Sequence, residues 1–107
     1  MAYNDDIIRA VWEKGRGIPD QDQTDWRRDQ CGAWMHRTHY NNAESEFGWK
    51  ILNVVAGGGD ELDNLQPFHW NNTFDIASSK PQCRVTADRT GLMPTQQYLD
   101  QPRNTTV

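Results

Sequence analysis

The stretch GWKILNVVAGGGDELDNLQPFHWNN, residues 48–72, contains the clearest secondary-structure signals in this chain of 107 residues. The branched apolar residues of WKILNVVA predict a strand over residues 49–56, and three consecutive glycines at positions 57–59 end it. Residues 67–77, PFHWNNTFDIA, are predicted to form a helix with Pro67 in its first turn, where a missing N–H costs no hydrogen bond. The stretch therefore predicts a strand, a glycine loop and a helix.

Two further elements precede this stretch. Residues 5–14 predict an amphipathic helix, because their apolar side chains share one face and their acidic residues suit the positive end of the helix dipole. Residues 33–37 are rich in large apolar side chains and predict a strand. The segment NNAESEFG after them predicts a turn, so residues 33–37 and 49–56 are expected to form a hairpin.

The length is enough for one domain, which we assign to residues 1–94, with a flexible tail at residues 95–107. Three of the five prolines follow residue 78, so little regular structure is expected there beyond a short strand at Val85. Aromatic residues supply much of the apolar area of a small core. That core is expected to include Trp34, Trp49, Leu65 and Trp70.

The two cysteines, Cys31 and Cys83, form no CxxC pair and suggest no disulfide framework. We therefore expect buried or free thiols in a reducing compartment. The sequence also contains no apolar run of about 18 residues and no basic segment followed by a hydrophobic one at its start. These features predict a soluble, cytoplasmic protein without a membrane partner.

Charge is distributed unevenly along the chain, whose formal net charge is −4. Residues 1–50 contain seven Lys and Arg residues, whereas residues 51–79 contain none and carry several acidic side chains. Nucleic-acid binding depends on cations that neutralise phosphates, so the second segment is poorly suited to hold a polyanion. Basic residues of the first half could fold against it, and direct nucleic-acid binding stays an open alternative.

The sequence resembles the HNH endonuclease family between Val11 and Asn72. The resemblance is carried by VWEKGRGIPDQDQTDWRRDQCGAWMHR, then by GW, GGGDELDNLQP and HWNN. In that family a β-hairpin and a following helix hold one divalent metal. The resemblance implies an α+β fold: an HNH-like ββα core with an added N-terminal helix and an irregular C-terminal tail.

The positions that carry the family's chemistry are altered. The family has an aspartate that binds metal and a histidine that acts as general base, and the matching residues here are Leu52 and Asn53. Leucine binds no metal, and an amide is no base at neutral pH. Asn64 matches the loop asparagine, and Asn72 matches the ligand of the helix. A single neutral amide is a poor Mg²⁺ site.

The surroundings of these vestigial positions are altered as well. The loop between the site strand and the glycines is shorter than the family's usual one. The lysine that commonly follows the helix ligand is also absent, since Thr73, Phe74 and Asp75 come next. We therefore predict a pseudo-nuclease with no catalytic residue, no bound metal and no cofactor.

Other residues offer weaker candidate sites. Cys31, His36 and His39 resemble a fragment of a zinc site, but residues three apart in a strand point to opposite faces, so packed or surface histidines are the favoured interpretation. His69 lies at helical spacing from Asn72, yet a histidine on the helix surface is the simpler interpretation. The acidic loop lacks the spacing of a calcium motif.

The sequence favours a non-catalytic binding protein that inhibits or regulates a nucleic-acid-processing protein or ribonucleoprotein. Phage-borne antagonists of host nuclease systems, including anti-CRISPR proteins, belong to this class. The expected partner-binding residues are the acidic side chains Asp60, Glu61, Asp63 and Asp75. Two alternatives stay open: an atypical metal-dependent HNH endonuclease that recruits His69 as a base, and a structural protein of a phage or mobile element.

Overall fold

The helix expected near the N-terminus is present as α1, Asp5–Trp12, in the computed structural model, which describes residues 3–17, 22–87 and 104–106. Asn4 caps the helix, because its side-chain oxygen accepts a hydrogen bond from the N–H of Ile7 at 2.9 Å. The opposite end buries Val11 and Trp12. Capping and apolar periodicity are both local signals, and the prediction of this helix is confirmed.

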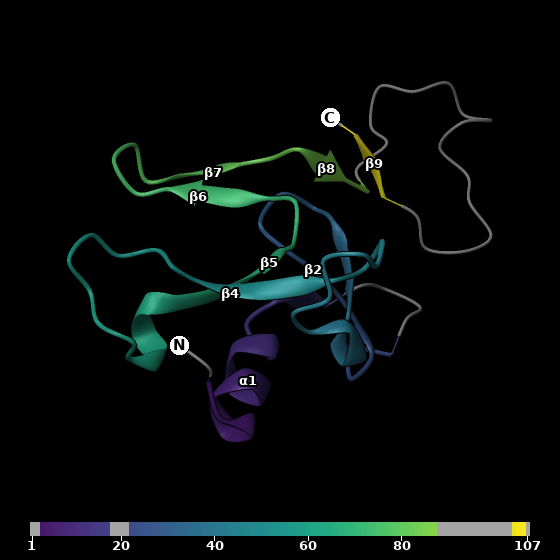
Figure 1. Ribbon diagram of the computed structural model, residues 1–107, viewed down its shortest axis with the longest axis horizontal. Helices are drawn as coiled ribbons and strands as arrows, with labels where there is room; N and C mark the ends of the chain where they lie inside the picture. The colour runs from purple at the N-terminus through teal and green to yellow at the C-terminus, as the bar shows by residue number, and fades with distance from the viewer. Residues whose placement is uncertain (1–2, 18–21, 88–103, 107) are drawn as a thin grey trace.

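The rest of the described chain consists of short antiparallel strand pairs and two single-turn 3₁₀ helices. A three-stranded sheet has the order β1-β2-β3, and the other strands pair as β4 with β5, β6 with β7 and β8 with β9. The bounds are β1 Arg16–Gly17, β2 Trp26–Arg28, β3 Trp34–His36, η1 Arg37–His39, β4 Trp49–Asn53, η2 Leu62–Asn64, β5 Leu65–His69, β6 Thr73–Asp75, β7 Lys80–Gln82, β8 Val85–Thr86 and β9 Thr105–Thr106. The β4–β5 pair lies in the middle of the molecule, with α1 on one side and the β6–β7 hairpin on the other (Figure 1). The fold is a small mixed α+β fold.

The helix predicted over residues 67–77 is wrong. Residues 65–69 form β5, whose register places Pro67 opposite Ile51, and the chain then turns into β6. β5 has a neighbouring strand on one side only, and proline is tolerated in such an edge strand. The pairing is extended by the N–H of Trp70, which donates to the carbonyl of Gly48 at 2.9 Å. Strand pairing therefore overrides the local signal of a proline at a helix start.

The hairpin expected between residues 33–37 and 49–56 is also wrong, although both strands exist. β3 pairs with β2, and β4 pairs with β5 across five residue pairs. The loop after β4 contains Gly57 with φ +69°, a left-handed conformation that glycine adopts without strain. This loop lets β4 pair with the strand that follows it. The strand predicted at Val85 is confirmed as β8.

The core lies between α1 and the β4–β5 pair. Its fully buried apolar side chains are Val11, Trp12, Met35, Trp49 and Leu65. The rings of Trp12 and Trp49 lie 5.0 Å apart, centroid to centroid. The predictions that Trp49 and Leu65 are core residues are confirmed. Trp34 and Trp70 are only half-buried, because they lie outside the region that α1 covers.

The prediction of free thiols is wrong, because Cys31 and Cys83 form a disulfide with a Cα–Cα distance of 5.5 Å. The two residues are 52 positions apart and come together only when the β6–β8 segment folds beside the β2–β3 turn. The argument for a reducing compartment loses its support, since disulfides persist mainly in oxidising environments. Among the described residues, none of the helices has the length and apolar character needed to cross a membrane.

The predicted flexible tail, residues 95–107, lies mostly outside the described residues. Its described part is Asn104 together with β9, which pairs with β8. The side-chain oxygen of Asn104 accepts from the N–H of Trp34 at 2.6 Å, and its Nδ2 donates to the carbonyl of Trp34 at 3.0 Å. The flexibility of the tail stays a prediction.

Candidate functional site

Three of the four vestigial HNH positions lie together at one end of the β4–β5 hairpin. Leu52 pairs with Gln66, and Asn53 pairs with Leu65. Asn64 directly precedes Leu65 in the chain. All three are half-buried. The structure therefore brings together three of the four positions that the resemblance singles out.

The two amides at this end bind the glycine loop. Asn53 Nδ2 donates to the carbonyls of Gly58 and Gly59, both at 2.8 Å, and Asn53 Oδ1 accepts from the N–H of Val55 at 3.0 Å. Asn64 Nδ2 also donates to the carbonyl of Gly59, at 3.1 Å. A Cβ atom at Gly58 would lie 2.8 Å from Asn64 Nδ2, so a larger residue there would displace the Asn64 side chain. Both side chains therefore stabilise the loop.

Asn72, the fourth position, lies at the other end of the hairpin. His69 is four positions along β5 from Leu65, about 13 Å of strand, and Asn72 follows His69 at this far end. Its side chain is fully buried. Asn72 Nδ2 donates to Asp29 Oδ2 at 2.9 Å and to the carbonyl of Val85 at 3.1 Å. The structure does not bring Asn72 together with the other three positions.

The remaining hydrogen-bonding capacity of Asn72 is also used. Its Oδ1 accepts from the N–H groups of Arg84 and Val85 at 2.7 and 3.0 Å. Two donor and two acceptor interactions match the full capacity of an amide of this kind. Asn72 therefore joins β8 to the rest of the fold.

Asp29 is the partner of Asn72 and was not found by sequence reasoning. It is 2% exposed, and its four accepted hydrogen bonds are each 2.9 Å long. The donors are the N–H groups of Cys31, Ala33 and His69 and the amide of Asn72. A buried carboxylate is tolerated when it is saturated with donors in this way. The aspartate two residues before Cys31 signals a local turn, but its contacts 40 and 43 residues away carry no sequence signal.

His69, the base of the nuclease alternative, lies in β5 and is only 2% exposed, which corrects the prediction that it lies on a helix surface. Nε2 lies 2.6 Å from the carbonyl of Glu46, and Nδ1 accepts from the N–H of Asn71 at 3.0 Å. Burial is the main cause that lowers the pKa of His69. Its ring is neutral and hydrogen-bonded on both nitrogens, so neither nitrogen is available to a substrate in this geometry.

The histidine pair of the predicted zinc-like fragment is close in space, with ring centroids of His36 and His39 4.9 Å apart. The 3₁₀ turn η1 brings them together, which the argument from a straight strand missed. Burial lowers the pKa of His36, and His39 adds to this effect. The third member, Cys31, is bound to Cys83. Within residues 3–17, 22–87 and 104–106, no three His, Cys, Asp or Glu side chains form a group that could hold a metal ion.

The acidic side chains expected to bind a partner divide into two sets. Asp60, Glu61 and Asp63 are exposed around the start of η2. Asp75 is half-buried and shapes the β6–β7 turn, where Oδ1 accepts from the N–H of Ala77 and Oδ2 from the hydroxyl of Ser78, both at 3.0 Å. Asp75 thus has a structural role of its own.

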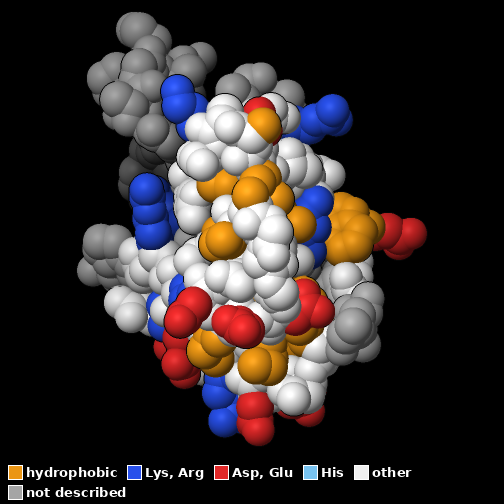
Figure 2. Space-filling view, turned by 90° about the vertical axis from the view of Figure 1, so that its left-hand side faces the viewer, with side chains coloured by type: hydrophobic (Ala, Val, Ile, Leu, Met, Phe, Trp, Pro, Cys, Tyr) orange, Lys and Arg blue, Asp and Glu red, His pale blue; other side chains and the backbone are white. Residues whose placement is uncertain are grey.

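Two large apolar side chains are exposed in the turns of the β4–β5 and β6–β7 hairpins. Val55 in the β4–β5 loop is 43% exposed, and Ile76 in the β6–β7 turn is 39% exposed. Both turns lie at the same end of the molecule (Figure 1). Figure 2 faces this end and shows hydrophobic side chains across its middle with Asp and Glu side chains below them. We call the surface of Val55, Ile76, Asp60, Glu61 and Asp63 the hairpin-tip face.

Lys14 holds the acidic part of this face in place. Its ammonium group donates to the carbonyls of Leu62 and Leu65, the latter at 2.9 Å, and so joins the end of α1 to η2. The sequence offered no signal for this contact, which spans about 50 residues.

Comparison with known proteins adds no relative, since no family model, no curated protein and no solved structure matches this chain.

Proposed function

We propose that this chain is a non-catalytic binding protein on an HNH-like scaffold, and that it inhibits or regulates a nucleic-acid-processing protein or ribonucleoprotein. The observation that carries the proposal is the use of Asn53 and Asn64, which hold a loop that presents exposed apolar and acidic side chains. An active nuclease would need polar groups at this end that are free to bind metal and water. Here the polar side chains at this end bind the backbone of an exposed loop.

The composition of the hairpin-tip face indicates the kind of partner. Val55 and Ile76 supply apolar contact area, and the three carboxylates supply negative charge beside it. A complementary partner surface is basic with an apolar centre, which describes the nucleic-acid groove of many proteins that process DNA or RNA. Charge complementarity of this kind raises the association rate and the specificity.

The loop needs little reorganisation to bind. Asn53, Asn64 and Lys14 each donate hydrogen bonds to backbone carbonyls of residues 58–65. Association is weakened by the entropy of ordering loops, so a loop held in this way binds more tightly than a mobile one. An anti-CRISPR or other anti-defence protein is one form of this function, and its cytoplasmic location requires the fold to persist without the Cys31–Cys83 bond.

The experiment is capture of a partner by the immobilised chain, followed by affinity measurement with the purified partner. The test variant is Asp60→Asn, Glu61→Gln and Asp63→Asn. The matched control removes three exposed carboxylates elsewhere: Asp6→Asn, Glu13→Gln and Glu44→Gln. We expect the test variant to weaken binding by about 1–3 kcal/mol and the control to bind like the wild type.

Two outcomes would overturn the proposal. Equal loss of affinity in the test and control variants would show that net charge, and not this face, governs binding. Nicking of plasmid DNA by the purified wild type with Mg²⁺ or Mn²⁺ would establish the nuclease alternative instead.

A further inference from the structure

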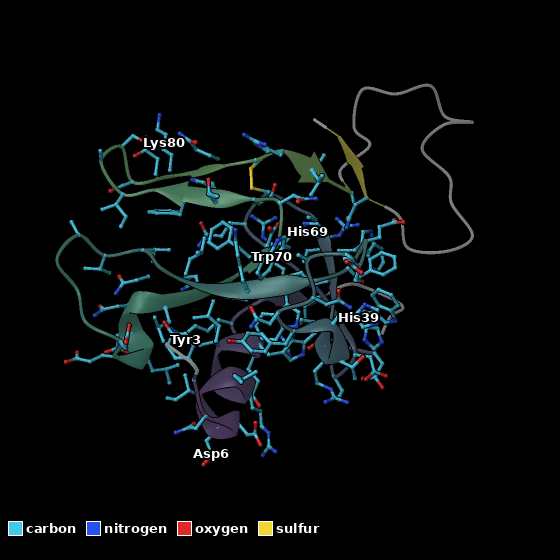
Figure 3. The ribbon with its side chains drawn as sticks, in the orientation of Figure 1. Tyr3, Asp6, His39, His69, Trp70 and Lys80 are labelled. Atoms are coloured by element: carbon cyan, nitrogen blue, oxygen red, sulfur yellow. A yellow bond between two sulfur atoms is a disulfide. The ribbon has the colours of Figure 1, made fainter. Side chains whose placement is uncertain are left out.

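A cavity of about 380 Å³ lies on the side of the molecule away from α1 and beside the disulfide. Its lining residues carry aromatic, amide, hydroxyl and guanidinium groups and no carboxylate: Trp70, Asn71, Thr73, Gln82, Cys83 and Arg84. The volume falls at the lower end of the range of small-molecule sites, roughly 300–1,000 Å³. Figure 3 shows Trp70 between the β4–β5 pair and the β6–β7 hairpin, below the yellow bond of the disulfide.

Trp70 provides a planar surface in this cavity. Its backbone is fixed by the hydrogen bond to Gly48, and its ring is half-buried. The ammonium group of Lys50 lies 5.5 Å from the centroid of this ring. Burial lowers the pKa of Lys50, as expected for a partly buried cation. An anion bound near Trp70 would therefore stabilise Lys50 as well.

Arg84 provides a second positive charge. Its N–H donates to Asn72 Oδ1 at 2.7 Å, which fixes the backbone, while its side chain is exposed. Within the described residues, Arg84 forms no ion pair with a carboxylate. A guanidinium group without a carboxylate partner suits a phosphate, which it can bind with two parallel hydrogen bonds.

We propose that this cavity binds a free nucleotide, with the base stacked on Trp70 and the phosphate bound by Arg84. Asn71, Thr73 and Gln82 offer donors and acceptors for the edge of the base. One guanidinium group can bind one phosphate group. A nucleic-acid strand would need further cations along its path, and the cavity lining contributes one, Arg84. This site is separate from the hairpin-tip face and does not depend on its function.

The test is an NMR titration of the full-length wild type with AMP, GMP, CMP and UMP, together with adenosine, inorganic phosphate and a single-stranded oligonucleotide. We expect saturable shifts for at least one nucleotide, centred on the amides of Trp70, Thr73 and Arg84. Adenosine and phosphate alone should each bind at least about tenfold more weakly than the nucleotide, because each lacks one half of the contacts.

Three variants locate the site. Arg84→Gln should weaken nucleotide binding by about tenfold and leave adenosine binding unchanged, since the backbone contact to Asn72 remains. Trp70→Leu should weaken the binding of both the nucleotide and adenosine by about tenfold. Lys80→Gln removes an exposed cation of the neighbouring strand that does not line the cavity, and should change binding by less than about twofold.

The proposal is overturned if no nucleotide gives saturable shifts at millimolar concentration, or if Lys80→Gln weakens binding as much as Arg84→Gln. Equal affinity for inorganic phosphate would show a simple anion site. An oligonucleotide that binds more than about tenfold tighter than the mononucleotide would show a strand-binding site instead.

Discussion

The two sides of the β4–β5 pair are held by different kinds of interaction. On the α1 side, the stability comes from apolar burial, with Trp12 and Trp49 in contact and no exposed surface left on Trp49. On the β6–β8 side, the main connections are the Cys31–Cys83 bond and the hydrogen bond from Asn72 to Asp29, with an aromatic contact between Phe68 of β5 and Phe74 of β6. Truncating a buried side chain should destabilise the first side most. Reducing the disulfide or removing a hydrogen bond should destabilise the second.

The largest effect is expected from Trp49→Ala on the α1 side. Removing a fully buried indole should lower the free energy of unfolding by about 3–5 kcal/mol, because a cavity remains where the core was filled. Urea denaturation followed by circular dichroism measures the loss. Trp70→Ala is the comparison, since Trp70 is half-buried, and its loss should be clearly smaller. Similar losses for the two variants would contradict the distinction between the sides.

Opening the disulfide should have the next largest effect. The bond closes a loop of 52 residues, so its removal should lower the free energy of unfolding by roughly 2–4 kcal/mol. The measurement is the urea midpoint of the wild type with and without reductant. The double variant Cys31→Ser, Cys83→Ser should resemble the reduced wild type and show no response to reductant. An unchanged midpoint on reduction would show that the β6–β8 side does not depend on the bond.

Asn72→Ala should cost about 1–3 kcal/mol, because it leaves three backbone groups of residues 84–85 and one acceptor oxygen of Asp29 without their partner. Hydrogen exchange can show where the loss occurs. Amides of β8 should exchange faster, while those of α1 should be little affected. Asn71→Ala is a suitable control, since Asn71 is exposed and contributes its backbone N–H to His69.

A smaller effect is expected from pH. Burial lowers the pKa of His69 in the folded state, so the unfolded state takes up the proton first as the pH falls. The contribution of His69 to the stability is therefore fully present above the unfolded-state pKa of about 6.5, and it decreases as the pH falls below that value. His36 acts in the same direction. Urea midpoints at pH 7.5 and 5.5 should differ less in His69→Gln than in the wild type. An equal difference would assign the pH response to other groups.

The parts of the fold that could be predicted are those with local signals. The apolar periodicity and the acidic first turn of residues 5–14 identified α1, and the branched residues before Gly57 identified β4. The prediction for the segment after Leu65 was wrong because this segment becomes a strand by pairing with β4. Pairing partners are a property of the whole fold, and a helix-like start at Pro67 carries no information about them.

The residues of the candidate site also divide into those with a local sequence signal and those placed by long-range contacts. Asn53 and Asn64 are two positions that the family resemblance singles out, and in the structure both donate to the carbonyl of Gly59. The position of Asn72 depended on a helix that is absent, so it was placed wrongly. Its partner Asp29 is 43 residues away, and the cysteines are 52 residues apart. Contacts at such separations are set by tertiary packing, for which one sequence gives no signal.

The most direct test of the account compares Asn72→Ala with the variant Asp60→Asn, Glu61→Gln, Asp63→Asn in one experiment that measures both the free energy of unfolding and the affinity for the captured partner. The account predicts opposite results. Asn72→Ala lowers the stability and leaves the affinity of the folded protein unchanged, whereas the acidic variant lowers the affinity by about 1–3 kcal/mol and leaves the stability nearly unchanged. The reverse result, with Asn72 needed for binding and the three carboxylates dispensable, would contradict the assignment of function to the hairpin-tip face.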